Sequence, residues 1–147
     1  MEIYFYHLEN QALSSILPDL LRRGLERGLR MAVETSLPEK LERLSSALWA
    51  AEDVSFLPHG YAEDVPHTQP IWLSADAANP NAATYRFYVD GALPLEIGGL
   101  KRALIMIDST SEEALVNART EWKKRKAEGH QVSYWKQDEN HRWANLA

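Results

Sequence analysis

The sequence of 147 residues contains no cysteine, no long hydrophobic run and no low-complexity segment. Without cysteine, a disulfide scaffold, a cysteine-based zinc site and a thiol nucleophile are excluded. No apolar stretch approaches the roughly 20 residues that a membrane span requires. The N-terminus, MEIYFYHLENQ, lacks the basic and apolar regions of a signal peptide. We therefore expect a soluble, cytoplasmic protein that has no contact with a membrane.

Sequence motifs for phosphate binding, catalysis and metal binding are missing as well. Neither GxGxxG nor GxxxxGK[ST] occurs, so no glycine-rich loop is available to hold phosphates. No GxSxG elbow and no HExxH motif is found. The polar residues of segment 59–67 have no metal-ligand spacing and are typical of a solvated loop. The sequence thus predicts no enzyme, no catalytic residue, no cofactor and no metal ion.

The charge is negative overall but unevenly distributed. The formal net charge of -5 argues against a surface that wraps DNA or RNA as a whole, because such binding depends on neutralising phosphates. Two segments are nevertheless basic: 22–30 holds four arginines against Glu26, and 118–130 holds five cations against Glu121 and Glu128. An acidic protein with local basic segments is suited to a small acidic ligand. The five cations are Arg119, Lys123, Lys124, Arg125 and Lys126.

Short apolar segments alternate with helical patterns along the chain. The order of the elements is β-α-β-α-β, then further strands, then β-α-β, which is typical of a mostly parallel sheet flanked by helices. We expect an α/β fold in a single domain, 1–147, that is Rossmann-like but has no phosphate-binding loop. The strands expected from the apolar runs are 3–8, 29–34, 70–73, 84–90, 103–107 and 131–137, with a very short strand or extended turn at 54–57.

Three helices are predicted from apolar spacing and from capping residues. The first occupies Ala12–Arg27 and is expected to become regular near Pro18, because proline is tolerated in the first turn. The second begins after Thr35 or Ser36, carries Pro38 in its first turn, and ends at about residue 50; a loop is expected at 58–69. The third, 111–128, is expected to be capped by Ser109 or Thr110 and to end at Gly129.

Aromatic residues and a proline gather where the second helix ends. Trp49 lies at the helix end, and Phe56 and Pro58 follow in the next segment. These side chains either belong to the core, which the sequence slightly favours, or form an exposed patch that docks a partner.

The last helix places apolar and basic stripes side by side. Leu115, Ala118 and Trp122 form an apolar stripe that should face the sheet. The neighbouring stripe is either a solvated basic face or the binding site for a peptide that has both a carboxylate and a hydrophobic end. This stripe consists of Val116, Arg119, Lys123 and Lys126.

Three segments carry a family resemblance. ALWAAEDVSFLPHG (47–60), the basic helix ARTEWKKRKAEG and YWKQDENHRW (134–143) together resemble the chi subunit of bacterial DNA polymerase III. The chain length and the strand at its start are also similar to that family. The resemblance extends over nearly the whole chain.

The resemblance implies a non-enzymatic accessory of the clamp loader with an α/β fold similar to nucleotide-binding domains. It implies that one surface binds the psi subunit and another binds the acidic, phenylalanine-ended tail of the single-stranded-DNA-binding protein. The residues that match the psi-facing region are Trp49, Phe56, Leu57, Pro58 and His59. Those that match the tail-binding region are Val116, Arg119, Trp122 and Lys123, with Lys126 on the same helix.

Three functional hypotheses follow. The leading one is an adaptor that connects the clamp loader to coated single-stranded DNA and so contacts DNA indirectly. The alternative is a direct nucleic-acid binder, in which the basic helix contacts phosphates and Trp122 or Trp135 stacks on bases. A small nucleotide-dependent enzyme is the third hypothesis, and the missing phosphate loop argues against it.

Overall fold

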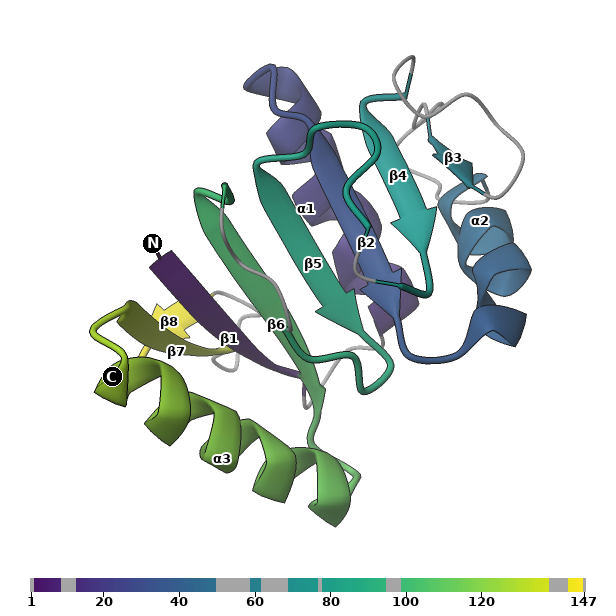
Figure 1. Ribbon diagram of the computed structural model, residues 1–147. Helices are drawn as coiled ribbons and strands as arrows, with labels where there is room; N and C mark the ends of the chain where they lie inside the picture. Colours follow the sequence, from purple (N-terminus) through teal and green to yellow (C-terminus); the bar gives the residue numbers. More distant parts are fainter. Residues whose placement is uncertain are drawn as a thin grey trace.

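The computed structural model describes residues 2–8, 13–49, 59–61, 69–76, 78–94, 99–137 and 143–146. They form one eight-stranded sheet with helices on both faces (Figure 1). The helical elements are α1 (Leu13–Glu26), the 3-10 turn η1 (Pro38–Lys40), α2 (Leu41–Trp49) and α3 (Glu112–Ala127). The strands are β1 (Glu2–Leu8), β2 (Met31–Thr35), β3 (Gly60–Tyr61), β4 (Ile71–Ser74), β5 (Tyr85–Val89), β6 (Arg102–Asp108), β7 (Gln131–Gln137) and β8 (Trp143–Asn145).

The sheet is parallel except at one edge. The strand order is β3-β4-β2-β5-β6-β1-β7-β8, and only the pair β7 and β8 is antiparallel. The α1 connection takes the chain from β1 to β2 past two intervening strands, and the α3 connection takes it from β6 past β1 to β7. This arrangement confirms the predicted α/β class with a mostly parallel, helix-flanked, Rossmann-like sheet.

The hydrophobic pattern does not predict β3 or β8. β3 lies inside the segment 58–69 that the sequence assigns to a loop, and it pairs with Trp72 and Leu73 of β4. β8 pairs with the edge of β7, where Asn145 lies opposite Trp135. Strands of two or three residues are too short to show an alternation of period two, so only their partners reveal them. The extended segment expected at 54–57 lies outside the described residues.

Alternating residues of the strands build two hydrophobic clusters, one on each face of the sheet. In β6, Leu104 and Met106 pack on the side of α1 and α2, whereas Ile105 and Ile107 pack on the side of α3. α1 and α2 thus cover one face and α3 the other (Figure 1).

Pro18 lies inside α1 and not at its start. The helix begins five residues earlier, at Leu13, which corrects the expected beginning near Pro18. A proline within a helix removes one backbone hydrogen bond and crowds the preceding turn. Pro18 is buried here together with Leu17, and Leu21 one turn later is fully buried. Burial of this face against the sheet offsets the local cost of the proline.

The capping residues differ from those expected for both later helices. Ser111, and not Ser109 or Thr110, caps α3 by accepting a hydrogen bond from the Ala114 amide at 3.1 Å. Ser109 instead donates to the Leu8 carbonyl at 2.7 Å, and the Thr110 hydroxyl donates to Asp108. Gly129, with φ +89°, ends α3 as predicted.

The second helix is entered through η1, whose capping position is Leu37, with no side-chain hydrogen bond at that position. Thr35 still accepts a hydrogen bond from the Leu37 amide at 3.2 Å, whereas Ser36 donates to the Asp90 carbonyl. The expected cap at Thr35 or Ser36 is therefore replaced by a tighter turn that starts at Pro38.

A buried ion pair connects β2 and β5. Arg86 donates through Nη2 to Glu34 Oε1 at 2.7 Å and through Nε to the same oxygen at 3.0 Å. The guanidinium also donates to the carbonyls of Asp76 and Ala78, at 2.7 Å and 3.0 Å. Burial raises the pKa of the Glu34 carboxyl, and the hydrogen bonds from Arg86 oppose that shift. Arg86 therefore holds the connection between β4 and β5 against the sheet.

Candidate functional site

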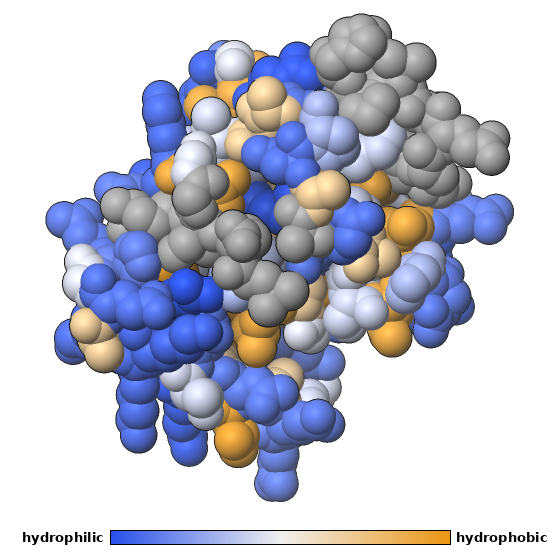
Figure 2. Space-filling model, viewed as in Figure 1, coloured by the Kyte–Doolittle hydropathy of each residue, from blue (hydrophilic) through white to orange (hydrophobic). Residues whose placement is uncertain are grey.

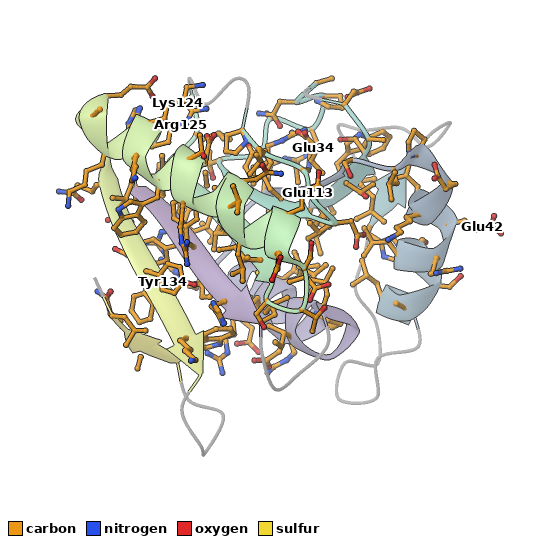
Figure 3. The ribbon with its side chains drawn as sticks, turned by 90° about the horizontal axis from the view of Figure 1, so that it is seen from below. Glu34, Glu42, Glu113, Lys124, Arg125 and Tyr134 are labelled. Atoms are coloured by element: carbon orange, nitrogen blue, oxygen red, sulfur yellow. The ribbon has the colours of Figure 1, made fainter. Side chains whose placement is uncertain are left out.

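Helix α3 lies across β1, β6 and β7 (Figures 1 and 3). Its apolar stripe packs against the sheet. Ala118 is buried there, and Leu115 and Trp122 are half-buried against the cluster built by Phe5 and Ile105. The sequence prediction for this stripe is confirmed.

Arg125 does not belong to the exposed basic surface. Its side chain is only 6% exposed, and its Nε donates to Glu121 Oε1 at 2.6 Å. Its two other nitrogens donate to Glu128 at 3.1 Å and to the Pro94 carbonyl at 2.6 Å. These contacts neutralise the charge and fasten α3 to the segment that follows β5. Spacings of four and three residues from Arg125 to Glu121 and Glu128 are the sequence signal for this network.

The other four cations of the helix are exposed: Arg119, Lys123, Lys124 and Lys126. At about 100° per residue, Lys124 lies on the opposite flank of α3 from Arg119 and Lys126. In Figure 3, Lys124 and Arg125 lie near the C-terminal end of the helix. Lys124 and Arg125 therefore do not share the flank of Trp122, although both belong to the basic segment 118–130.

Trp122 is held by aromatic neighbours. Its ring centroid lies 5.5 Å from that of Phe5 and 6.2 Å from that of Tyr134, whose hydroxyl shares a hydrogen bond with His7. The ammonium of Lys126, four residues later, lies 5.9 Å from the Trp122 ring centroid. The ring is half-buried, so its exposed part lies beside Arg119 and Lys126.

Val116 extends the same surface toward the start of the helix. It is 57% exposed, which is unusual for a large apolar side chain in this fold. Arg119 follows one turn later along the helix and Lys123 two turns later, and both are exposed. Hydrophilic residues dominate the surface in the region of α3 in Figure 2, with single hydrophobic residues between them. We call the following set the α3 flank: Leu115, Val116, Arg119, Trp122, Lys123 and Lys126.

A comparison with known protein families identifies the family of this chain. The family model of the DNA polymerase III chi subunit, HolC, matches residues 1–133. The chain belongs to this family. It is therefore an accessory subunit of DNA polymerase III and acts in DNA replication. Among curated proteins, none matches the sequence significantly.

The region expected to face psi in this chi-family chain is described only in part. Phe56, Leu57, Pro58 and the side chain of Trp49 lie outside the described residues. His59 is 7% exposed, and its Nε2 shares a hydrogen bond with Ser45 Oγ of α2 at 2.8 Å. His59 thus fastens the start of β3 to α2.

The two tryptophans named for base stacking lie on opposite faces of the sheet. Trp122 packs in the cluster under α3, whereas Trp135 packs on the other face, beside Tyr4 and Tyr6. A single nucleic-acid surface composed of α3 and Trp135 is therefore wrong for this fold. The alternation of side chains along β7 puts Trp135 on the face away from α3.

A cavity of about 750 Å³ opens at the carboxyl ends of the central strands, where doubly wound folds bind their ligands. The described residues around it include three carboxylates, Asp90, Asp108 and Glu113, against one lysine, Lys40. Hydrogen bonds from Thr110 lower the pKa of Asp108, so that this carboxylate is ionised at neutral pH. The charge of this lining is unfavourable for a phosphate.

The described part of the chain includes neither a membrane-spanning helix nor a cluster of metal ligands. None of its helices combines the length and the hydrophobicity needed to cross a bilayer. Nor do three or more of its described His, Asp or Glu side chains come together as metal ligands.

Proposed function

We propose that this chi-family chain connects DNA polymerase III to single-stranded-DNA-binding protein by binding that protein's C-terminal tail on the α3 flank. The observation that supports this proposal is the exposed row of cations beside a half-buried tryptophan on one helix. Through this contact the chain reaches DNA indirectly and acts as a non-catalytic, cytoplasmic adaptor.

The chemistry of the tail fits this surface. An acidic peptide that ends in phenylalanine offers side-chain carboxylates, a terminal carboxylate and an aromatic ring. Arg119 can hold a carboxylate through two parallel hydrogen bonds, and Lys123 and Lys126 supply mobile point charges. Val116 and Trp122 offer apolar surface for the ring on the two sides of Arg119.

The phenylalanine ring must supply a large part of the affinity. Exposed ion pairs contribute only about 0–1 kcal/mol each. Burial of an aromatic ring contributes about 25 cal/mol for each Å² of apolar area removed from water. A peptide without its terminal phenylalanine should therefore bind far more weakly than the complete tail.

The test is a titration of the full-length protein with a fluorescently labelled tail peptide, followed by fluorescence anisotropy. We expect saturable binding by the complete peptide and nearly complete loss when the terminal phenylalanine is deleted. Equal binding of the two peptides would show that the ring has no site on this protein, and the proposal would then fail.

We also propose that the segment around Trp49, Phe56, Leu57, Pro58 and His59 docks psi where that subunit is present. Support comes from the family resemblance of 47–60 and from the anchoring of His59 to α2, which fixes the end of this segment. One chain would then hold the clamp loader and the coated DNA strand at the same time.

A further inference from the structure

The face of β1, β7 and β8 opposite α3 carries a row of aromatic rings. Tyr4 lies 5.5 Å from Trp135, and Trp135 lies 6.5 Å from Tyr6 in a stacked arrangement. Tyr6 in turn contacts Trp143 of β8 edge-on, with 4.8 Å between the ring centroids. The rings therefore form a continuous chain of contacts across three neighbouring strands.

No described helix covers this face at β7 and β8. α1 lies behind β2 and β5 in Figure 1, and in the view from below it is separated from β7 and β8 (Figure 3). Tyr4, Trp135 and Trp143 are half-buried, whereas Tyr6 between them is only 8% exposed.

Arginines continue the row toward the N-terminal ends of the strands. The guanidinium of Arg102 lies 4.2 Å from the centroid of Tyr4 and 5.1 Å from that of Tyr85. The guanidinium of Arg27, at the end of α1, lies 5.9 Å from the Tyr85 centroid. Arg27 belongs to the basic segment 22–30, which the α3 flank does not use. We call this set the aromatic–arginine row: Arg27, Tyr85, Arg102, Tyr4, Trp135, Tyr6 and Trp143.

The arginines keep hydrogen-bonding capacity for a ligand. Arg102 donates through Nε and Nη2 to Glu2, at 2.9 Å and 2.5 Å, and this ion pair offsets its charge. Its Nη1 has no hydrogen-bond partner among the described residues and stays available to a ligand. The side chain of Arg27 is exposed and is engaged there only by the Tyr85 ring. Burial raises the pKa of Tyr6 to about 12, and the positive charges of Arg102 and, more weakly, Arg23 oppose this shift. Arg23, one turn before Arg27 on α1, therefore also lies near the row.

We propose that the aromatic–arginine row binds single-stranded DNA. Partly exposed rings on a sheet are stacking platforms for unpaired bases, and guanidinium groups beside them pair with the phosphates between those bases. The row extends over five neighbouring strands, β5 to β8 in spatial order, or about 19 Å at 4.8 Å per strand. Such a row has places for several flat bases in succession, whereas a peptide with one aromatic end would occupy only one of them.

This surface is independent of the α3 flank. The two lie on opposite faces of the sheet and share no residue, so substitutions can separate them. An adaptor with both surfaces would contact the exposed strand directly beside the protein that coats it. Binding of single-stranded DNA by this row does not depend on tail binding, and a separate titration tests it.

The test is a titration of full-length protein into a fluorescein-labelled dT 15-mer at low salt, with the tail peptide titrated in parallel. Arg27→Glu reverses a charge in the row, and Lys124→Glu reverses one on the opposite face; both side chains are exposed, so neither change threatens the fold. We expect Arg27→Glu to weaken oligonucleotide binding by about fivefold or more and Lys124→Glu by less than about twofold. Tail binding should be unchanged in Arg27→Glu.

Binding of the oligonucleotide should also quench tryptophan fluorescence, because bases would stack on Trp135 and Trp143. The proposal is overturned if the wild-type protein does not bind the oligonucleotide, if binding leaves the fluorescence unchanged, or if the two variants weaken it equally.

Discussion

At the scale of single residues, two buried arginines pair with carboxylates at very different separations along the sequence. Arg125 pairs with Glu121 on its own helix, and that spacing can be found in the sequence. Arg86 pairs with Glu34, which lies 52 residues away on another strand. The sequence identifies 84–90 as a strand, but the partner of Arg86 depends on the strand order, and no local pattern contains that order.

The pair also leads to a prediction for stability. Arg86→Met should destabilise the protein by about 3–5 kcal/mol, because Glu34 would be left buried without its counter-charge. Loss of Arg86 would raise the folded-state pKa of Glu34 further above its unfolded value. The folded state would then hold a proton that the unfolded state releases, so stability would fall as pH rises between those two pKa values.

Urea unfolding at pH 5 and pH 8 measures both effects. The loss in free energy of unfolding caused by Arg86→Met should be larger at pH 8 than at pH 5. The double variant Glu34→Leu with Arg86→Met should recover much of this loss. If the loss in free energy of unfolding is the same at both pH values, Glu34 is not the group that is left unpaired.

At the scale of elements, strands and helices with a strong local pattern are predictable from the sequence. The run 103–107 predicts β6, and the spacing of Leu115, Ala118 and Trp122 predicts the buried face of α3. β8 is not predictable, because three residues carry too little pattern and the strand depends on pairing with β7. The sequence misplaces the start of α1, because tertiary packing outweighs the local preference of Pro18.

The cap of α3 gives a prediction at this scale. Ser111→Ala should lower the free energy of unfolding by about 1 kcal/mol, because the Ala114 amide loses its acceptor. Thr110→Ala removes an exposed hydroxyl one residue earlier and should cost less than about 0.5 kcal/mol. Urea unfolding compares the two, and equal losses would contradict the assignment of Ser111 as the cap.

At the scale of the whole molecule, the fold separates the two basic segments of the sequence. Segment 118–130 supplies the α3 flank on one face, and segment 22–30 supplies Arg27 to the other. The sequence indicates both segments and the residues of the α3 flank. It cannot indicate that Trp122 and Trp135 lie on opposite faces, because that follows from how α3 and β7 meet the sheet.

The proposed psi surface is tested by assembly. Phe56→Ala should weaken association with psi by about 2 kcal/mol or more while the fold survives, since aromatic anchors dominate protein interfaces. Calorimetric titration of psi measures the affinity, and circular dichroism controls for folding. A Phe56→Ala protein that unfolds would instead assign Phe56 to the core.

The central claim is that the α3 flank binds the tail of single-stranded-DNA-binding protein. It is tested most directly by titrating the tail peptide into wild type, Arg119→Ala and Lys124→Ala at two salt concentrations. Both variants lose one exposed cation from the same helix, but only Arg119 lies beside Trp122 and Val116. We predict that Arg119→Ala weakens binding by about fivefold and Lys124→Ala by less than about twofold. Added salt should weaken binding without abolishing it, because ring burial is not screened. If Arg119→Ala binds the tail as tightly as wild type does, the tail site is not on the α3 flank.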